Sequence, residues 1–252
     1  MKVDLNADVG ESFGPYVLGD DSALMRHVTS VNVACGFHAG DSHVMRRTVQ
    51  LARDCGVTIG AHPGFPDLGG FGRRAMSLTP SEIEDIVVYQ VGALAAMATA
   101  CGTRIRHVKP HGALYNQAAA DPASAAAVAR AVATLDPQLT LVGLAGSHLV
   151  TAGREAGLHT ASEVFADRGY DEEGRLLARQ MDGAVIHDLD MVRERAVWMV
   201  QNRAVPTRSG GRLPRDVDTI CIHGDTEGAP ALARSLREAL TAAGVTIGAL
   251  GL

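Results

Sequence analysis

Residues able to do acid–base chemistry stand at or just past the ends of several short apolar runs in this sequence. They are Asn6 and Asp8, Asn32, His62, Lys109 with His111, Glu163, and His223 with Asp225. One such residue alone is usually a hydrogen-bonded polar group, but burying many together is costly unless they pair or act on a substrate. We therefore predict an active site whose catalytic candidates are Asp8, His62, Lys109, His111, Glu163 and His223.

Lys109 is notable because only two of the 23 basic residues are lysines, the other being Lys2. It stands between Val108 and Pro110, where surface solubility does not explain a charge. An ammonium group approaches a phosphoryl or carbonyl oxygen as a compact point charge. The alternative is that Lys109 neutralises a buried carboxylate, Asp8 or Glu163.

Two glycine-rich segments follow apolar runs. One contains Gly36 and His38 and leads into a helix N-terminus, where backbone N–H groups can hold an anion or an oxyanion. The other ends in Arg73 and Arg74, whose guanidinium groups suit a carboxylate or a phosphate. The alternatives are a tight turn and a solvated basic loop. The substrate- or phosphate-binding candidates are Asn6, Asn32, Gly36, His38, Arg73, Arg74 and Asp225.

A catalytic metal is a further interpretation. Three protein ligands with an open coordination position are typical of such a site. The candidate ligands are Asp8, His38 and His62, while His43 and His223 are of suitable type. His38 and His43 are five residues apart and do not share one helical face, so the spacing signal is weak.

Composition excludes several function classes. The 28 acidic residues outnumber the basic ones and give a net charge of −5, with no basic stripe, which argues against a nucleic-acid or membrane-surface partner. No P-loop, GxGxxG turn, GxSxG elbow or HExxH helix occurs, so any nucleotide is not held by a P-loop. The four cysteines form no CxxC pair, and we expect reduced, buried thiols in a cytoplasmic protein without a signal peptide or a membrane span.

Short apolar runs alternate with helical patterns along the whole chain, which predicts repeated βα units. The expected strands are 3–7, 28–34, 57–61, 105–109, 139–144, 160–164 and 219–222, with a weaker eighth at 184–186. Capping signals predict helices that begin after Asp41, Thr79 and Asp121 and at Pro230. The first of these should bury Val44, Leu51 and Cys55.

An open doubly wound sheet and a closed barrel both fit this alternation. An open sheet gathers its polar groups mainly at one switch point, whereas a barrel collects them from nearly every strand at its C-terminal mouth. The spread of polar strand ends favours an α/β fold made of one (β/α) barrel domain over residues 1–252.

The motifs DLNADVGE, NVACGFHAGD, GAHPGFPDLGGFGRR, VKPHGALYN, EVFADR and CIHGD, taken in order, resemble the LamB/YcsF family. Its members are known as the A subunit of the bacterial ATP-dependent 5-oxoprolinase. The resemblance spans the chain and implies an irregular barrel of about seven parallel strands, similar to the glycoside hydrolase/deacetylase barrel. It also implies a cytoplasmic enzyme that opens 5-oxo-L-proline to L-glutamate with subunits B and C, using ATP as co-substrate, with Mg²⁺ accompanying it.

That reaction requires a cationic clamp for phosphoryl charge, an anchor for the substrate carboxylate and a base for water. We expect Lys109, Arg73 and Arg74 to form the clamp and Asp8 or Glu163 to be the base. His62, His111 or His223 would donate a proton to the leaving amine, and the Gly36 turn would hold an oxyanion. Two other classes stay open: an autonomous metal-dependent amidohydrolase or deacetylase, and a non-catalytic substrate-binding subunit.

Overall fold

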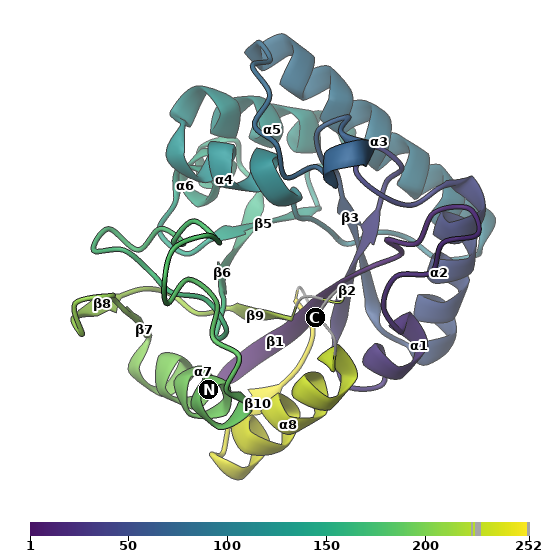
Figure 1. Ribbon diagram of the computed structural model, residues 1–252. Coiled ribbons are helices and arrows are strands. Elements are labelled where there is room, and N and C mark those ends of the chain that lie inside the picture. Colours follow the sequence, from purple (N-terminus) through teal and green to yellow (C-terminus); the bar gives the residue numbers. More distant parts are fainter. Residues whose placement is uncertain (223, 225–227, 251–252) are drawn as a thin grey trace.

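The fold is a closed barrel of parallel strands surrounded by helices, shown by a computed structural model that describes residues 1–222, 224 and 228–250 (Figure 1). Seven strands pair in the order β1-β2-β3-β4-β5-β6-β9, and β9 pairs with β1 to close the ring. They are β1 (Lys2–Val9), β2 (Ser30–Ala34), β3 (Thr58–His62), β4 (His107–Val108), β5 (Thr140–Leu144), β6 (His159–Val164) and β9 (Thr219–Ile222). The predicted barrel and its seven strands are confirmed.

The predicted eighth strand at 184–186 is wrong. Val185 forms only an isolated antiparallel bridge with Arg168, and the backbone of Ala184 and Ile186 bonds to the segment that follows β6. Three residues paired within their own loop do not reach the barrel. Nothing in the sequence indicated β10 (Thr246–Ile247), which extends the sheet beside β1, or the hairpin β7 (Ala204–Pro206) and β8 (Arg212–Pro214).

The helices lie outside the barrel. Those predicted after Asp41, Thr79 and Asp121 begin there, and the one predicted at Pro230 begins one residue earlier, at Ala229. The helices are α1 (Asp21–Leu24), α2 (Ser42–Cys55), α3 (Pro80–Ala100), α4 (Gly112–Ala120), α5 (Pro122–Leu135), α6 (His148–Glu155), α7 (Leu189–Asn202) and α8 (Ala229–Ala242), with the 3₁₀ turn η1 (Leu68–Gly70). Thr79 and Glu82 form a reciprocal capping box at the start of α3. Cys55 is exposed, against expectation, because it ends α2 on the solvent side.

Helix α3 is the one helix of the described residues that is long and apolar enough, by length and composition alone, to cross a membrane. In the fold it packs against α5 and β3, with Ile83, Val87 and Leu94 buried. This packing buries 33% of the apolar window of α3, along one face of the helix.

Side chains alternate between two layers along the strands. Val3 and Leu5 of β1 belong to the apolar core between the sheet and the helices. Asp4, Asn6 and Asp8 point the other way, into the barrel, where they meet polar groups of the other strands. Barrel interiors of this kind are usually filled by Val, Ile and Leu, so a polar interior marks the place where chemistry can occur.

Candidate active site

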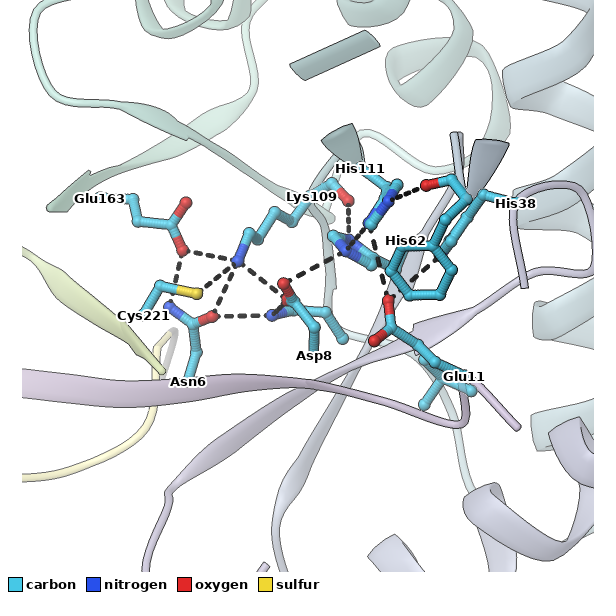
Figure 2. A network of polar contacts seen from close by, with 12 residues as sticks. Asn6, Asp8, Glu11, His38, His62, Lys109, His111, Glu163 and Cys221 are labelled. Carbon is cyan, nitrogen blue, oxygen red and sulfur yellow. Dashed lines mark hydrogen bonds and ion pairs between the residues drawn. The ribbon is translucent and has the colours of Figure 1, made fainter. Parts of the chain in front are cut away.

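Lys109 lies at the centre of the polar interior, just after β4 (Figure 2). Its Nζ atom lies 2.9 Å from Asp8 Oδ1, 2.9 Å from Glu163 Oε1, 2.9 Å from Cys221 Sγ and 3.2 Å from Asn6 Oδ1. Burial lowers the pKa of Lys109, but Asp8, Cys221 and Glu163 outweigh burial, so the pKa lies well above its ordinary value. Lys109 is therefore a charged, buried ion-pair partner of both predicted carboxylates.

Two asparagines hold these carboxylates in place. Asn6 Nδ2 donates to Glu163 Oε1 at 2.9 Å and to Thr219 Oγ1 at 2.7 Å. Asn32 Nδ2 donates to Asn6 Oδ1 at 2.7 Å and to Asp8 Oδ1 at 2.8 Å. Because every amide group here is committed to a neighbour, Asn6 and Asn32 fix the positions of charged groups.

Asp4 lies at the opposite end of this network. Its carboxylate accepts hydrogen bonds from Thr219 Oγ1 at 2.5 Å, Ser30 Oγ at 2.6 Å and Thr29 Oγ1 at 2.7 Å. Burial raises the pKa of Asp4, and these hydroxyl groups offset only part of that effect. A polar chain thus runs through the barrel from Asp4 to Asp8.

Beside Asp8 lies a cluster of four buried residues, which we name the histidine cluster: Glu11, His38, His62 and His111. One potential ligand atom from each lies within 4.8 Å of the others. The rings of His38 and His111 stack with centroids 3.7 Å apart, and His62 meets both edge-on (Figure 2). Burial lowers the pKa of His111 to about 3 and that of His38 well below its ordinary value, which favours neutral rings.

Backbone carbonyls set the tautomers of two of these rings. His62 Nδ1 lies 2.7 Å from the carbonyl of Lys109, and His111 Nε2 lies 2.8 Å from that of Phe71. A carbonyl only accepts, so these nitrogens carry the protons. In the neutral rings His62 Nε2 and His111 Nδ1 are therefore both lone pairs, and they face each other at 3.0 Å.

Glycines make room for the packed rings. A Cβ atom at Gly64 would lie 2.8 Å from His38 Nδ1, and one at Gly72 would lie 2.7 Å from His38 Cβ and 2.9 Å from His111 Cδ2. Gly72 also has a φ of +63°, a conformation that side chains with a Cβ rarely adopt. The glycine-rich segment between β3 and α3 is thus shaped by the histidine cluster.

A cavity of about 340 Å³ opens over this floor at the C-terminal mouth of the barrel. This volume lies at the small end of the range found for small-molecule sites. Asp8, Lys109, Glu11, His62 and His111 line it from below. Three arginines, Arg73, Arg168 and Arg179, line it as well. The cavity therefore combines an ion pair, imidazole lone pairs and positive charge suited to an anionic small molecule.

Comparison with known proteins agrees with this architecture. The sequence matches the model of the LamB/YcsF family over residues 3–251. The chain belongs to the LamB/YcsF family. It is 53% identical over 248 residues to a protein of Gluconobacter oxydans named as the A subunit of 5-oxoprolinase, and the match covers 98% of both chains. It is 55% identical over 245 residues to the protein of the same name from Geobacillus kaustophilus, and this match covers 97% of this chain and 95% of that one. The crystal structure of a lactam utilization protein from Thermus thermophilus superposes with a TM-score of 0.93 at 47% identity, covering 99% of this chain and all of that one.

Most of the predicted site residues come together in this LamB/YcsF barrel. Asn6, Asp8, Asn32, His38, His62, Lys109, His111 and Glu163 are all buried in its interior or at its mouth. Of these, Asp8, His62, Lys109 and His111 line the cavity, as does Arg73. Glu163 is fully buried behind Lys109 and does not line it, which separates the two candidate bases.

Other predicted residues lie elsewhere. Arg74 is exposed and pairs with Asp67 of its own loop, and it does not line the cavity. The N–H of Gly36 donates to the carbonyl of Ala39 at 2.9 Å within its own turn, so it is not available to an oxyanion. His223 and Asp225 lie outside the described residues.

Sequence reasoning missed several residues of the site. Glu11 stands within the DLNADVGE motif but is not among the predicted site residues, although it contacts both His38 and His111, at 3.4 and 3.7 Å. Cys221 is the reduced, buried thiol that was expected, but its contact with Lys109 was not foreseen: its Sγ accepts from Lys109, and burial raises its pKa well above the ordinary value. The alternation within β9 was the signal for Cys221, since it places Thr219 and Cys221 on the inward face together.

Proposed function

We propose that this chain is the A subunit of an ATP-dependent 5-oxoprolinase and opens 5-oxo-L-proline to L-glutamate together with subunits B and C. The observation that carries the proposal is the cavity whose floor is the Lys109–Asp8 ion pair and whose lining includes three arginines. The names of relatives that share more than half of their residues with this chain over its whole length support the substrate.

The chemical problem is a lactam, which is a stabilised amide. Transfer of the γ-phosphoryl group of ATP to the lactam oxygen releases ADP and makes the ring carbon open to attack by water. Water adds to that carbon, the C–N bond breaks, and the nitrogen takes a proton to become the amine of an acyl phosphate. A second water releases phosphate and leaves L-glutamate, so the overall reaction consumes ATP and two waters. Positive charge near the transferred group lowers the barrier of the first step.

The residues that line the cavity fit these steps. The ammonium group of Lys109, with Arg73, neutralises charge on the phosphoryl group and the lactam oxygen. Asp8 is the base for water, because it is the cavity-lining member of the two carboxylates bound to Lys109. Arg179, which is exposed at the cavity, anchors the substrate carboxylate.

The proton-donor role expected of His62 and His111 does not fit the hydrogen bonds that their rings make. Both direct a lone pair toward the cluster and use their N–H groups on backbone carbonyls. In these tautomers the facing nitrogens accept rather than donate. Asp8 takes a proton from the attacking water, and this proton then goes to the leaving amine.

The absence of a P-loop from the sequence supports a role for partner chains. ATP, accompanied by Mg²⁺, is therefore bound either at a site without this motif or by a partner chain. A cytoplasmic location gives the enzyme access to ATP. Release of ADP that depends on 5-oxo-L-proline should be measured for this chain alone and with subunits B and C. Turnover only with all three supports the proposal. ATP-independent hydrolysis of lactams or acetylated sugars by the isolated chain would instead favour an autonomous amidohydrolase or deacetylase, and substrate binding without any effect on turnover would favour a non-catalytic binding subunit.

A further inference from the structure

The histidine cluster contains a contact that neutral rings cannot make by themselves. The lone pairs of His62 Nε2 and His111 Nδ1 point at each other across 3.0 Å. Two acceptors at that distance repel unless a positive species lies between or beside them. Oxygen atoms of Glu11 and Asp8 add negative charge at the same place, with Glu11 Oε1 3.7 Å from His111 Nδ1 and Asp8 Oδ2 3.4 Å from His62 Nε2.

His38 adds a third nitrogen to this group. Its side chain is fully buried, and within the described part of the chain neither ring nitrogen has a hydrogen-bond partner. Its Nε2 atom lies 3.4 Å from Glu11 Oε1. A buried imidazole without hydrogen bonds is costly, so this side chain also requires a partner.

We propose that Glu11, His38, His62 and His111 bind one divalent transition-metal ion of the Zn²⁺ class, through three imidazole nitrogens and one carboxylate oxygen. Ligands at about 2.0–2.2 Å from a tetrahedral centre lie about 3.3–3.6 Å from one another. The contacts of 3.0, 3.4 and 3.7 Å within the cluster bracket that value. Imidazole-rich sets suit Zn²⁺, Fe²⁺, Co²⁺ or Ni²⁺, whereas Mg²⁺ prefers oxygen ligands alone.

The surroundings of the cluster are those of a metal centre. His62 and His111 each donate their remaining N–H to a backbone carbonyl, which orients the ring and fixes the free nitrogen. Gly64 and Gly72 let the rings approach closely. Glu11, His62 and His111 line the cavity, whereas His38 does not, so the cavity gives an ion a path in and leaves one side of it open to small molecules.

The expected ligand set of Asp8, His38 and His62 is thereby revised. Asp8 Oδ1 is taken by Lys109 Nζ and Asn32 Nδ2, both at hydrogen-bond distance. Glu11 and His111 replace Asp8, which becomes a neighbour of the ion. This inference depends on the geometry of the cluster and is independent of the proposed reaction.

Metal binding by the intact chain tests the proposal without substrate or ATP. After treatment with a chelator and dialysis, Zn²⁺ is titrated by calorimetry and Co²⁺ by its visible absorption, which reports coordination by nitrogen and oxygen. We expect one equivalent of each metal. His38→Ala and Glu11→Gln should each lower the Zn²⁺ affinity at least ~100-fold, beyond the effect of losing an outer-shell contact. His43→Ala, which changes an exposed histidine on α2, is the matched control and should bind as the parent does.

Circular dichroism and thermal melts confirm that each variant is folded. Absence of saturable Zn²⁺ and Co²⁺ binding by the parent chain would overturn the proposal. So would parent-like affinity in both ligand variants. Nitrogen NMR of the histidine rings provides a second measurement: a proton shared between His62 and His111 that persists after addition of metal would assign their contact to that proton and exclude the ion.

Discussion

The ammonium group of Lys109 and the carboxylate of Asp8 lie 2.9 Å apart on the floor of the cavity at the barrel mouth. Asp8 also accepts from Asn32 on the same oxygen and directs its second oxygen toward His62 at 3.4 Å. This carboxylate therefore joins the lysine network to the histidine cluster. Substitutions in the contacts of Lys109 or in the histidine cluster should therefore affect the position and charge of Asp8.

Substitution of Lys109 tests the role of the buried cation. Lys109→Met leaves Asp8 and Glu163 without their partner, so we expect a loss of ~3–5 kcal/mol in the free energy of unfolding, measured with urea. Lys109→Arg keeps the charge, but a planar guanidinium group does not fit among four acceptors. We expect it to lower turnover of the reconstituted complex at least ~100-fold. Near-normal turnover of Lys109→Arg would show that only charge balance matters.

Asp8→Asn and Glu163→Gln form a matched pair, because both carboxylates bind Lys109 and only one lines the cavity. We expect Asp8→Asn to lower turnover by ~10²–10⁴-fold, the usual contribution of a general base. Glu163→Gln should retain at least about ten times more turnover than Asp8→Asn. The measurement is ADP release dependent on 5-oxo-L-proline, and the reverse order would assign the base to Glu163.

Arg73 and Arg74 are adjacent in sequence but differ in their surroundings. Arg73 lines the cavity, whereas Arg74 pairs with Asp67 at the surface. Arg73→Ala should raise the KM for 5-oxo-L-proline or ATP at least ~10-fold, the effect of losing one charge-assisted hydrogen bond. Arg74→Ala should leave both KM values within about twofold of the parent. Equal effects in the two variants would contradict the assignment of the cavity as the binding site.

Gly64 provides a test of the packing around His38. A Cβ atom there would lie 2.8 Å from His38 Nδ1, so Gly64→Ala should displace the ring and destabilise the fold by ~1–3 kcal/mol. Gly92, inside α3, has open space around it. Gly92→Ala should therefore stabilise the chain by ~0.5–1 kcal/mol through helix propensity. Urea unfolding of both variants checks this contrast, and a neutral Gly64→Ala would mean that His38 has room to move.

His107 predicts a loss of stability in acid. Burial, followed by the charges of Lys109 and His62, lowers its pKa to about 3, whereas the unfolded chain titrates near its ordinary value. The unfolded state thus binds a proton first as the pH falls, and stability present above pH ~6.5 is lost progressively between ~6.5 and ~3. At pH 5 the effect of this group is on the order of 2 kcal/mol. Unfolding measured from pH 7 to 5 should show a smaller pH dependence in His107→Gln than in the parent, and equal slopes would contradict it.

The fold could be predicted from the sequence because the patterns that indicate its helices and strands are local. The capping signal at Thr79 depends on residues close in the chain, and the helix start that it predicts is confirmed. The strand predicted at 184–186 was wrong because a short apolar run does not specify which segment it pairs with. Here it pairs with the loop after β6.

The site was only partly readable because its details depend on contacts between distant segments. Polar strand ends predict that Asp8, His62 and Lys109 meet at one mouth. The tautomers of His62 and His111, in contrast, depend on carbonyls of Lys109 and Phe71, and no local pattern specifies those contacts. The participation of Glu11 was hidden for the same reason, since its partners come from other loops.

The separation of apolar and polar layers has a consequence for how this barrel can change. Its apolar packing lies between the sheet and the helices, whereas the inward positions are matched as donors and acceptors. Libraries that randomise single inward positions should mostly yield unfolded chains, because one mismatched group disrupts its neighbours. Paired randomisation, such as Asn6 with Asn32, should recover folded barrels with new interiors, since the outer layer that carries most of the hydrophobic burial is left intact.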